Sequence, residues 1–212
     1  MSLADDVRLA TDLVRRGADL AASMRAESDL QVSHKTSVSD VVTAADHAAE
    51  AFVVEQLTAA RPDDGLLGEE GAQRPGTTGR RWIIDPVDGT YNFASGSDYW
   101  CSALALVDGD DVVLGAVAHH GTGRVWVGGP DVSTTCNGEP VAAIEDAEIG
   151  VLGVATYLHP GDIDRDHVRE PFLAAARLPA TVRMLGSGSM DLVGVTTGRL
   201  GAWFQQIGRA HV

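Results

Sequence analysis

Residues 82–93, which read WIIDPVDGTYNF, constrain the fold more than any other part of the chain. The run 81–84 is short, apolar and β-branched, a pattern typical of a strand that is buried on both faces. Asp85 lies at the end of this strand, and Pro86 after it cannot continue a hydrogen-bonded ladder. We therefore expect the chain to turn at Pro86 and to bring Asp88 beside Asp85.

The two residues that follow this pair of acids favour an anion site. Gly89 permits a backbone conformation or a close approach that a side chain would block, and Thr90 adds a hydroxyl at an expected helix start, where backbone N–H groups attract phosphate. Two neighbouring carboxylates repel each other unless a cation lies between them, and Mg2+ prefers such oxygen ligands. A β-turn whose aspartates only cap and hydrogen-bond uses the same residues, and on this stretch alone it is an equal alternative.

Two upstream segments contribute further acids. Residues 68–71 read GEEG, so Glu69 lies between glycines that allow a sharp bend, although paired glutamates are also usual in a solvated loop. Residues 35–46 run into a helical pattern in which Thr43 and Asp46 fit a capping box. Each segment can be explained by local structure alone. The order and spacing of the segments together have no such explanation.

The combined pattern resembles a known family. Asp-x-Val-Thr-x-x-Asp, Gly-Glu-Glu and Trp-Ile-Ile-Asp-Pro-x-Asp-Gly-Thr-x-Asn-Phe are similar to the motifs of the inositol monophosphatase family of metal-dependent, lithium-sensitive phosphatases. The match is strong over residues 35–93, and a weaker one covers 186–203. The resemblance implies a mixed α+β and α/β fold, the layered αβαβα sandwich of the sugar-phosphatase type, and a phosphoric monoester hydrolase.

The resemblance also implies a metal centre. Glu69, Asp85 and the Val87 carbonyl would bind a first Mg2+, and Asp85 with Asp88 would contribute to a second. Family members continue with a Trp-Asp helix start that supplies one more metal carboxylate, whereas this chain ends before it. We therefore expect a chain truncated at its C-terminus, with an incomplete second metal site.

Catalytic and substrate-binding roles follow from the same resemblance. Glu69 and the first metal would activate a water that Thr90 positions, with Asp46 behind it, for in-line attack on phosphorus. The N–H groups of Gly89 and Thr90 would hold phosphate oxygens. The alcohol would contact Asp88 and a late glycine-rich turn made of Gly186, Ser187 and Gly188. The expected substrate is a small phosphorylated alcohol or sugar, such as inositol-1-phosphate or histidinol phosphate.

Charge and cysteine content limit the partners and the compartment. The formal net charge of −14 argues against nucleic-acid binding, which needs clustered Lys and Arg, and an acidic enzyme that handles phosphates needs metal ions to attract them. No apolar run approaches membrane-spanning length. Cys101 and Cys136 make neither a disulfide framework nor a metal pair, which favours a reducing cytoplasm. A homodimer is expected because many relatives are dimers.

Periodicity predicts an N-terminal α+β domain at 1–143 and the start of a C-terminal α/β domain at 144–205. The first contains helices near 3–27 and 43–60, a short helix from Thr90, and hairpin strands at 99–107, 112–118 and 124–127. The second contains strands at 149–155 and 181–185, which alternate with helices at 166–176 and 190–197.

The C-terminal residues 206–212 have a separate interpretation. Ile207 to Val212 reads, codon by codon, as ATC GGA AGA GCA CAC GTC, a common sequencing-library adapter in one frame. We therefore expect the native sequence to end near Gln205. Inositol-specific relatives tend to carry an acid at the position of Gln205, which slightly disfavours inositol as the alcohol.

Several alternatives stay open. Lys35, the only lysine, is either a surface charge or a group near the active site. The pair His119 and His120 has no third ligand at a recognisable spacing, so polar residues at a strand end are favoured over a metal site. The whole chain could also be a non-catalytic relative that binds metal or phosphate, or a fragment that does not fold stably, since missing strands would expose sheet edges.

Overall fold

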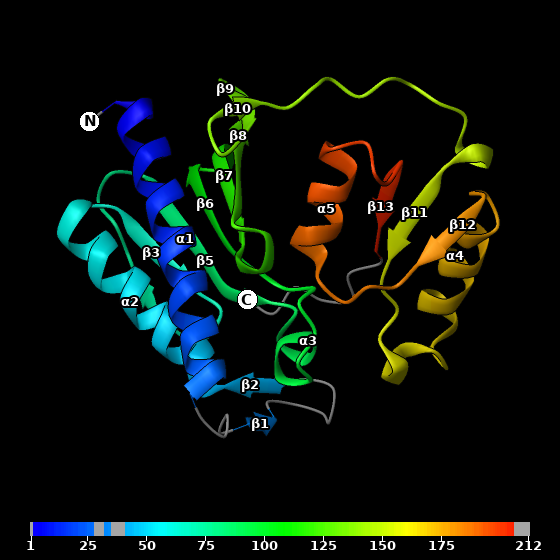
Figure 1. Cartoon of the computed structure of the whole chain (residues 1–212), viewed down its shortest axis with the longest axis horizontal. Coiled ribbons are helices and arrows are strands. Elements are labelled where there is room, and N and C mark those ends of the chain that lie inside the picture. Colours follow the sequence, from blue (N-terminus) through cyan, green and yellow to red (C-terminus); the bar gives the residue numbers. More distant parts are fainter. Residues whose placement is uncertain (1, 28–31, 35–40, 206–212) are drawn as a thin grey trace. The chain divides into compact units, whose positions relative to one another are not determined.

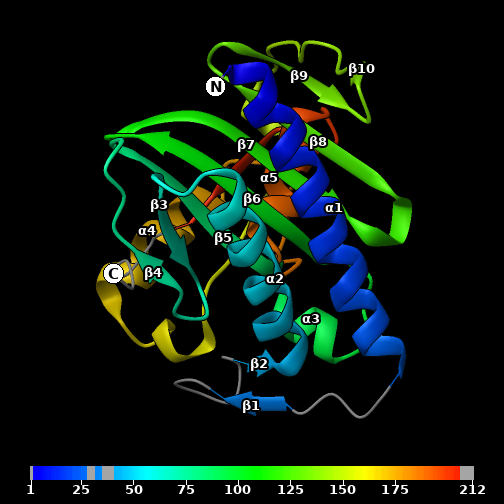
Figure 2. The same ribbon diagram turned by 90° about the vertical axis from the view of Figure 1, so that its left-hand side faces the viewer.

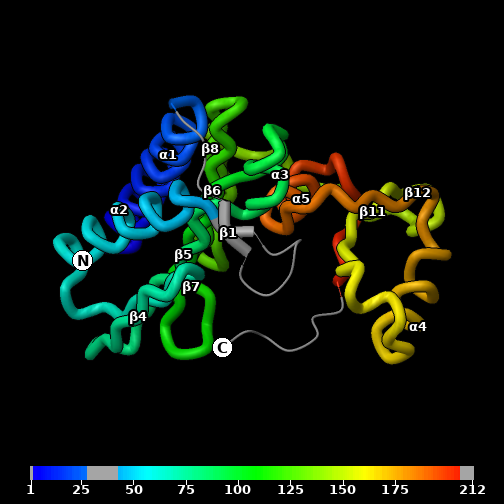
Figure 3. The backbone as a smooth tube through the Cα atoms, turned by 90° about the horizontal axis from the view of Figure 1, so that it is seen from below, coloured from blue at the N-terminus to red at the C-terminus, as the bar shows by residue number. Residues whose placement is uncertain are grey.

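The computed structural model describes residues 2–27, 32–34 and 41–205, and the chain divides into two compact units, Met1–Val141 and Ala142–Val212. The path of each unit can be followed in the ribbon of Figure 1 and in the tube of Figure 3. Lys35 and the suspected adapter segment 206–212 lie outside the described residues.

In the first unit the described residues form an eight-stranded sheet with the order β10-β9-β8-β7-β6-β5-β3-β4. All neighbouring strands are antiparallel except β3 and β5, which run parallel. The predicted hairpins are therefore confirmed. The strands are β3 (Gly65–Gly68), β4 (Gln73–Arg74), β5 (Arg80–Asp88), β6 (Cys101–Asp108), β7 (Asp111–His119), β8 (Arg124–Gly129), β9 (Val132–Cys136) and β10 (Glu139–Pro140).

Two helices cover one face of this sheet, as Figure 2 shows. They are α1 (Leu3–Glu27) and α2 (Ala44–Ala60), and both agree with the predicted helices. The apolar stripe of α1 is buried against the sheet because its small and branched side chains recur at helical spacing. A short two-stranded sheet, β1 (Val32–His34) with β2 (Val41–Thr43), precedes α2.

The central strand β5 differs from the prediction in its burial. Trp82 and Ile84 are buried in the core under the helices, but Ile83 between them is only partly buried. Alternation of this kind is expected of a sheet whose helices, within this unit, pack on a single face. The expectation of a strand buried on both faces was therefore wrong.

The chain also does not turn at Pro86. Strand β5 continues to Asp88, and its register with β6 passes from Asp85↔Ala103 to Asp88↔Cys101, so that one extra residue forms a β-bulge. A bulge accommodates a proline because the bulged residue need not donate to the ladder. The buried hydroxyl of Ser102 donates to the Pro86 carbonyl at 2.5 Å and holds the bulge in place.

The second unit contains a three-stranded parallel sheet with the order β12-β11-β13 in its described part. Its strands are β11 (Gly153–Thr156), β12 (Thr181–Arg183) and β13 (Ala202–Phe204), and its helices are α4 (Asp166–Ala176) and α5 (Gly188–Thr196). The predicted alternation of strands and helices is confirmed. The expected strand at 149–155 was wrong in its first half, because Ile149–Val151 forms an exposed 3-10 turn before the pairing with β12 begins.

Among the described residues, no helix combines the length and the apolar character that a membrane span requires.

Candidate active site

Two acids meet where the parallel strands β3 and β5 lie side by side. The register pairs Gly68 with Ile84, and the backbone N–H of Glu69 donates to the Ile84 carbonyl at 3.1 Å. Glu69 therefore follows β3 at the level where β5 presents Asp85. The only parallel pair of the described sheet thus brings the GEEG turn next to the bulge.

Asp85 is the most perturbed group of this region. Its pKa lies well above the ordinary value, because burial disfavours its charge and because the carboxylates of Asp88, Glu69 and Asp46 add repulsion. A hydrogen bond with Glu69 raises the pKa further. The Asp85 Oδ1 atom is buried and has no hydrogen-bond partner. A buried carboxylate oxygen without a donor is costly, which suits a site that receives a cation.

The hydroxyl of Thr90 connects the two sides of the site. Thr90 is the first residue of α3 (Thr90–Ala94), and its Oγ1 lies 3.0 Å from Asp46 Oδ1 and 2.9 Å from the Val87 carbonyl oxygen. Because a hydroxyl carries one proton, Thr90 donates to one of these acceptors at a time or shares its proton between them. Its lone pairs remain available to accept from a further donor.

Asp46 serves two partners with its two oxygens. Its Oδ2 accepts from the Thr43 N–H at 3.0 Å and from the Thr43 hydroxyl at 2.5 Å, which completes the predicted capping box of α2. Its Oδ1 accepts from Thr90. Burial raises the pKa of Asp46, and the hydrogen bonds from Thr43 and Thr90 act in the opposite direction. The cap thus fixes the carboxylate that holds Thr90.

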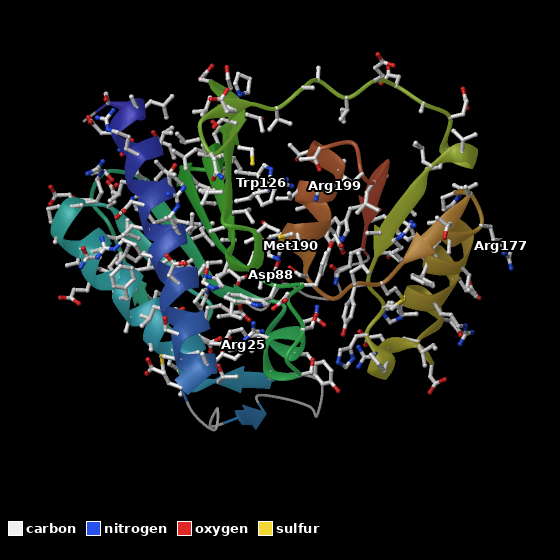
Figure 4. All side chains as sticks on the ribbon, in the orientation of Figure 1. Arg25, Asp88, Trp126, Arg177, Met190 and Arg199 are labelled. Carbon is white, nitrogen blue, oxygen red and sulfur yellow. The ribbon has the colours of Figure 1, made fainter. Side chains whose placement is uncertain are left out.

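Asp88, labelled in Figure 4, ends β5, and Gly89 alone connects it to α3. Asp88 is partly buried, and the thiol of Cys101 lies 3.9 Å from its Oδ2. Gly89 adopts a left-handed conformation with φ 93°, in which a side chain would be strained. This conformation lets the chain leave the strand and begin the helix within one residue.

The described residues contain no group of three or more His, Cys, Asp and Glu side chains that is already spaced to hold a metal ion. Asp85 instead makes a hydrogen bond with Glu69, which contributes to the raised pKa of Asp85. A cation would bind these carboxyls in their ionised form, because metal ligands must be deprotonated. The donor set is oxygen only, and the buried partnerless oxygen of Asp85 fits a hard cation such as Mg2+.

Comparison with known proteins gives the family. A sequence model described as the inositol monophosphatase family matches residues 3–211. The chain belongs to this family. A histidinol-phosphatase of Mycobacterium tuberculosis is 31% identical over 192 residues, which are 86% of this chain and 71% of the relative. An inositol-1-monophosphatase of Rhizobium meliloti is 32% identical over 201 residues, which are 91% of this chain and 73% of the relative.

Solved structures show the same fold. The suhB protein of Bartonella henselae superposes with a TM-score of 0.85 at 23% identity, covering 94% of this chain and 78% of that one. The inositol monophosphatase of Thermotoga maritima gives a TM-score of 0.79 at 26% identity, covering 92% and 74%. The family, its mixed layered fold and its enzyme class, phosphoric monoester hydrolase, are thereby confirmed as predicted.

The first unit of this inositol monophosphatase family member brings most of the predicted site residues together: Asp46, Glu69, Asp85, Val87, Asp88, Gly89 and Thr90. The turn formed by Gly186, Ser187 and Gly188 belongs to the second unit, where Ser187 is buried and precedes α5. Its contact with the alcohol part of the substrate stays a prediction.

Sequence reasoning missed Glu50. This residue of α2 is buried, and its carboxylate accepts from the backbone N–H groups of Glu70 and Ala72. A signal was present, since an acid four residues after Asp46 lies on the same helical face as Asp46 and should be solvated unless it has a partner.

Sequence reasoning missed Arg25 because its partners lie far from it in the sequence. It lies at the end of α1 near α3 in Figure 4, donates to the Ser97 carbonyl and to Asp98, and stacks over the rings of Phe93 and Trp100. It holds the segment that follows Thr90.

The histidine pair has partners of other kinds. His119 Nε2 lies 2.8 Å from the Asp98 carbonyl oxygen, and His120 Nδ1 lies 2.8 Å from Asp19 Oδ1. The His120 ring also stacks on Trp100. These contacts support the interpretation of the pair as polar residues at a strand end.

Proposed function

We propose that this chain catalyses the Mg2+-dependent hydrolysis of a small phosphate monoester. The observation that carries the proposal is the buried, partnerless Oδ1 of Asp85 beside the carboxylates of Asp88, Glu69 and Asp46. Relatives named for phosphatase activity support the reaction class, and a solved family structure is described as complexed with Mg2+ and phosphate.

Glu69, Asp85 and the Val87 carbonyl would hold a first Mg2+, and Asp85 with Asp88 would contribute to a second. Bound there, Mg2+ would supply positive charge that offsets the acids and the charge that develops on the phosphate oxygens. Burial and repulsion raise the pKa of Asp85, and a cation held there would oppose both effects, because metal ligands must be deprotonated.

The attacking water would be held by Thr90 and Glu69. Asp46 and the Val87 carbonyl fix the direction of the Thr90 proton, so the lone pairs of Thr90 Oγ1 can accept a hydrogen bond from the water. Glu69 would take the proton of that water as its oxygen forms the new bond to phosphorus in line with the ester oxygen. The ester P–O bond breaks, and the alcohol leaves with a proton from solvent.

The phosphate would lie against the start of α3. The first N–H groups of a helix have no partner inside it, and the left-handed Gly89 brings its own N–H and that of Thr90 into the loop after Asp88. We propose these two N–H groups as donors to the phosphate oxygens. Asp88 and the turn Gly186, Ser187 and Gly188 would contact the alcohol.

The substrate class is a phosphorylated alcohol or sugar. Relatives named histidinol-phosphatase and inositol-1-monophosphatase are 31% and 32% identical, so identity does not separate the two alcohols. We propose inositol-1-phosphate and histidinol phosphate as the first candidates.

Phosphate release from a panel of monoesters, measured against Mg2+ concentration, tests the proposal. We expect release from at least one small monoester, none in the presence of a chelator, and a loss of both Mg2+ binding and turnover in Asp85→Asn. Near-normal turnover of Asp85→Asn, or equal turnover with and without chelator, would overturn it. Calorimetry that showed Mg2+ and ester binding without turnover would favour a non-catalytic relative.

Two further properties are proposed on narrower grounds. The cytoplasm is proposed as the compartment because neither of the described cysteines, Cys101 and Cys136, forms a disulfide. A homodimer is proposed from the family resemblance, and sedimentation at micromolar concentration tests it.

A further inference from the structure

We infer that Glu50 is a positioning residue for Glu69, through a carboxylate that holds the backbone on both sides of it. The inference rests on the proposed function, in which Glu69 binds Mg2+ and activates water. It concerns a residue that touches neither the metal nor the phosphate.

Glu50 grips the turn that follows β3. Its Oε2 accepts from the Glu70 N–H at 2.7 Å, and its Oε1 accepts from the Ala72 N–H at 2.9 Å. The side chain is 4% exposed, so neither hydrogen bond competes with much water. Charge-assisted bonds from backbone N–H groups to a buried carboxylate are among the stronger hydrogen bonds of a protein. The turn is therefore fastened to α2 at two points.

Gly68 shows how closely the carboxylate approaches. A Cβ atom built on Gly68 would lie 2.3 Å from Glu50 Oε2 and 2.7 Å from Oε1, distances that real atoms do not adopt. The backbone at residue 68 and the carboxylate of Glu50 are thus in direct contact, and the contact exists only because residue 68 has no side chain.

One residue, Glu69, connects the backbone held by Glu50 to Asp85. Glu69 lies between Gly68, which contacts Glu50, and Glu70, which donates to it. Its own N–H donates to the Ile84 carbonyl at 3.1 Å, directly before Asp85. The turn is closed by the Gly68 N–H, which donates to the Ala72 carbonyl at 2.7 Å. Glu50 therefore fixes the backbone from which the Glu69 side chain reaches Asp85.

A glutamine at this position could not do the same. Its amide has one accepting oxygen and one NH2 group, so one of the two N–H donors would face another donor. The turn would lose one attachment, and Glu69 would sample positions away from Asp85. Groups that orient metal ligands typically change metal affinity about 10-fold to 100-fold when they are replaced.

The test compares Glu50→Gln with Glu55→Gln, which removes an exposed carboxylate from the same helix. Three quantities are measured at a temperature where all variants are folded: the Mg2+ Kd by calorimetry, hydrogen exchange of the Glu70 and Ala72 amides without metal, and kcat with KM at saturating Mg2+. For Glu50→Gln we expect a Kd raised about 10-fold to 100-fold, faster exchange of both amides, and a lower kcat at little changed KM. Glu55→Gln should match the wild type in all three.

A second variant perturbs the contact without removing Glu50. Gly68→Ala should push the carboxylate off its two donors, which lowers stability as well, and should reproduce the weaker Mg2+ binding. Glu50→Ala removes the carboxylate that a Cβ atom at residue 68 would meet. In that background, Gly68→Ala should therefore raise the Mg2+ Kd by less than about twofold. The Gly68→Ala variant also tests the inference if Glu50→Gln fails to fold.

The outcomes separate the two proposals. A wild type that neither binds Mg2+ nor releases phosphate contradicts the proposed function. A wild type that does both, beside Glu50→Gln and Gly68→Ala variants with unchanged Kd, overturns the inference alone. A loss of melting temperature with unchanged Kd and unchanged amide exchange would also overturn it, because it would give Glu50 a general structural role.

Discussion

Thr90 and Asp46 are 44 residues apart in the sequence, and their side chains meet at 3.0 Å. The contact joins the first turn of α2 to the first turn of α3. Asp46 is held in place from the other side by Thr43, which caps α2. A capping box thereby orients the hydroxyl that we propose to hold the attacking water.

Replacing Thr90 by Ala should lower kcat by about 10²-fold to 10⁴-fold, the usual contribution of a positioned proton-transfer group. The Mg2+ Kd should change little, because the Val87 carbonyl and the acids stay in place. Thr90→Ser should recover most of the loss, since it restores the hydroxyl. Kinetics at saturating Mg2+ check the prediction.

The matched control is Tyr91→Phe, which removes an exposed hydroxyl from the same helix and should leave kcat unchanged. A Thr90→Ala variant that retained more than half of wild-type kcat would remove Thr90 from the mechanism.

The sequence predicted the helices, the hairpins and the set of acids, because each is encoded locally by periodicity, turn residues and motif spacing. Glu50 was missed because, although its position on the helix indicates that it needs a partner, its partners are backbone N–H groups of a turn in another segment. The path of the chain at Pro86 was also not predicted. The neighbouring strand β6, which contains Ser102, holds Pro86 in a β-bulge, so the chain does not reverse there.

The pKa of Asp85 predicts how the stability of the metal-free protein depends on pH. A carboxyl whose pKa is raised on folding binds its proton more tightly in the folded state, so it costs stability as pH rises above the pKa of the unfolded chain, about 3.9. Asp85→Asn removes this cost. The melting temperature of Asp85→Asn minus that of the wild type, measured without metal, should therefore grow as pH rises from about 4.

Millimolar Mg2+ should reverse this order at neutral pH, because it stabilises only the wild type. Asp110→Asn, which alters an exposed acid in the turn between β6 and β7, should show neither effect. A melting difference that stays flat with pH would contradict the assignment of the raised pKa to Asp85.

Arg25 should contribute to stability and to activity together. Its guanidinium donates to the Ser97 carbonyl at 2.8 Å and lies 5.1 Å from the Phe93 ring centroid, so it fastens the end of α3 to α1. Arg25→Ala should lower the free energy of unfolding by about 1–3 kcal/mol and reduce kcat by loosening the helix that carries Thr90. Urea unfolding measures the first effect and steady-state kinetics the second.

The control for Arg25 is Arg8→Ala, which removes an exposed arginine of the same helix that pairs with the exposed Asp5. It should change the free energy of unfolding by less than about 0.5 kcal/mol. Equal effects of the two substitutions would show that the ring and carbonyl contacts of Arg25 add nothing to stability.

A buried ionic group at the opposite end of β5 should affect stability alone. Asp6 is 2% exposed, accepts from Arg61 Nη2 at 2.8 Å with one oxygen and from Arg80 Nη2 at 2.5 Å with the other, and ties α1 to the end of α2 and the start of β5. Asp6→Ala leaves the buried guanidinium of Arg61 without its counter-charge, which typically costs about 3–5 kcal/mol.

Asp12→Ala breaks an exposed pair with Arg16 and should cost less than about 1 kcal/mol. Because β5 separates Asp6 from Asp85, kcat of the folded Asp6→Ala protein at low temperature should match the wild type. A specific loss of kcat at unchanged stability would instead place this group in the chemistry of the site.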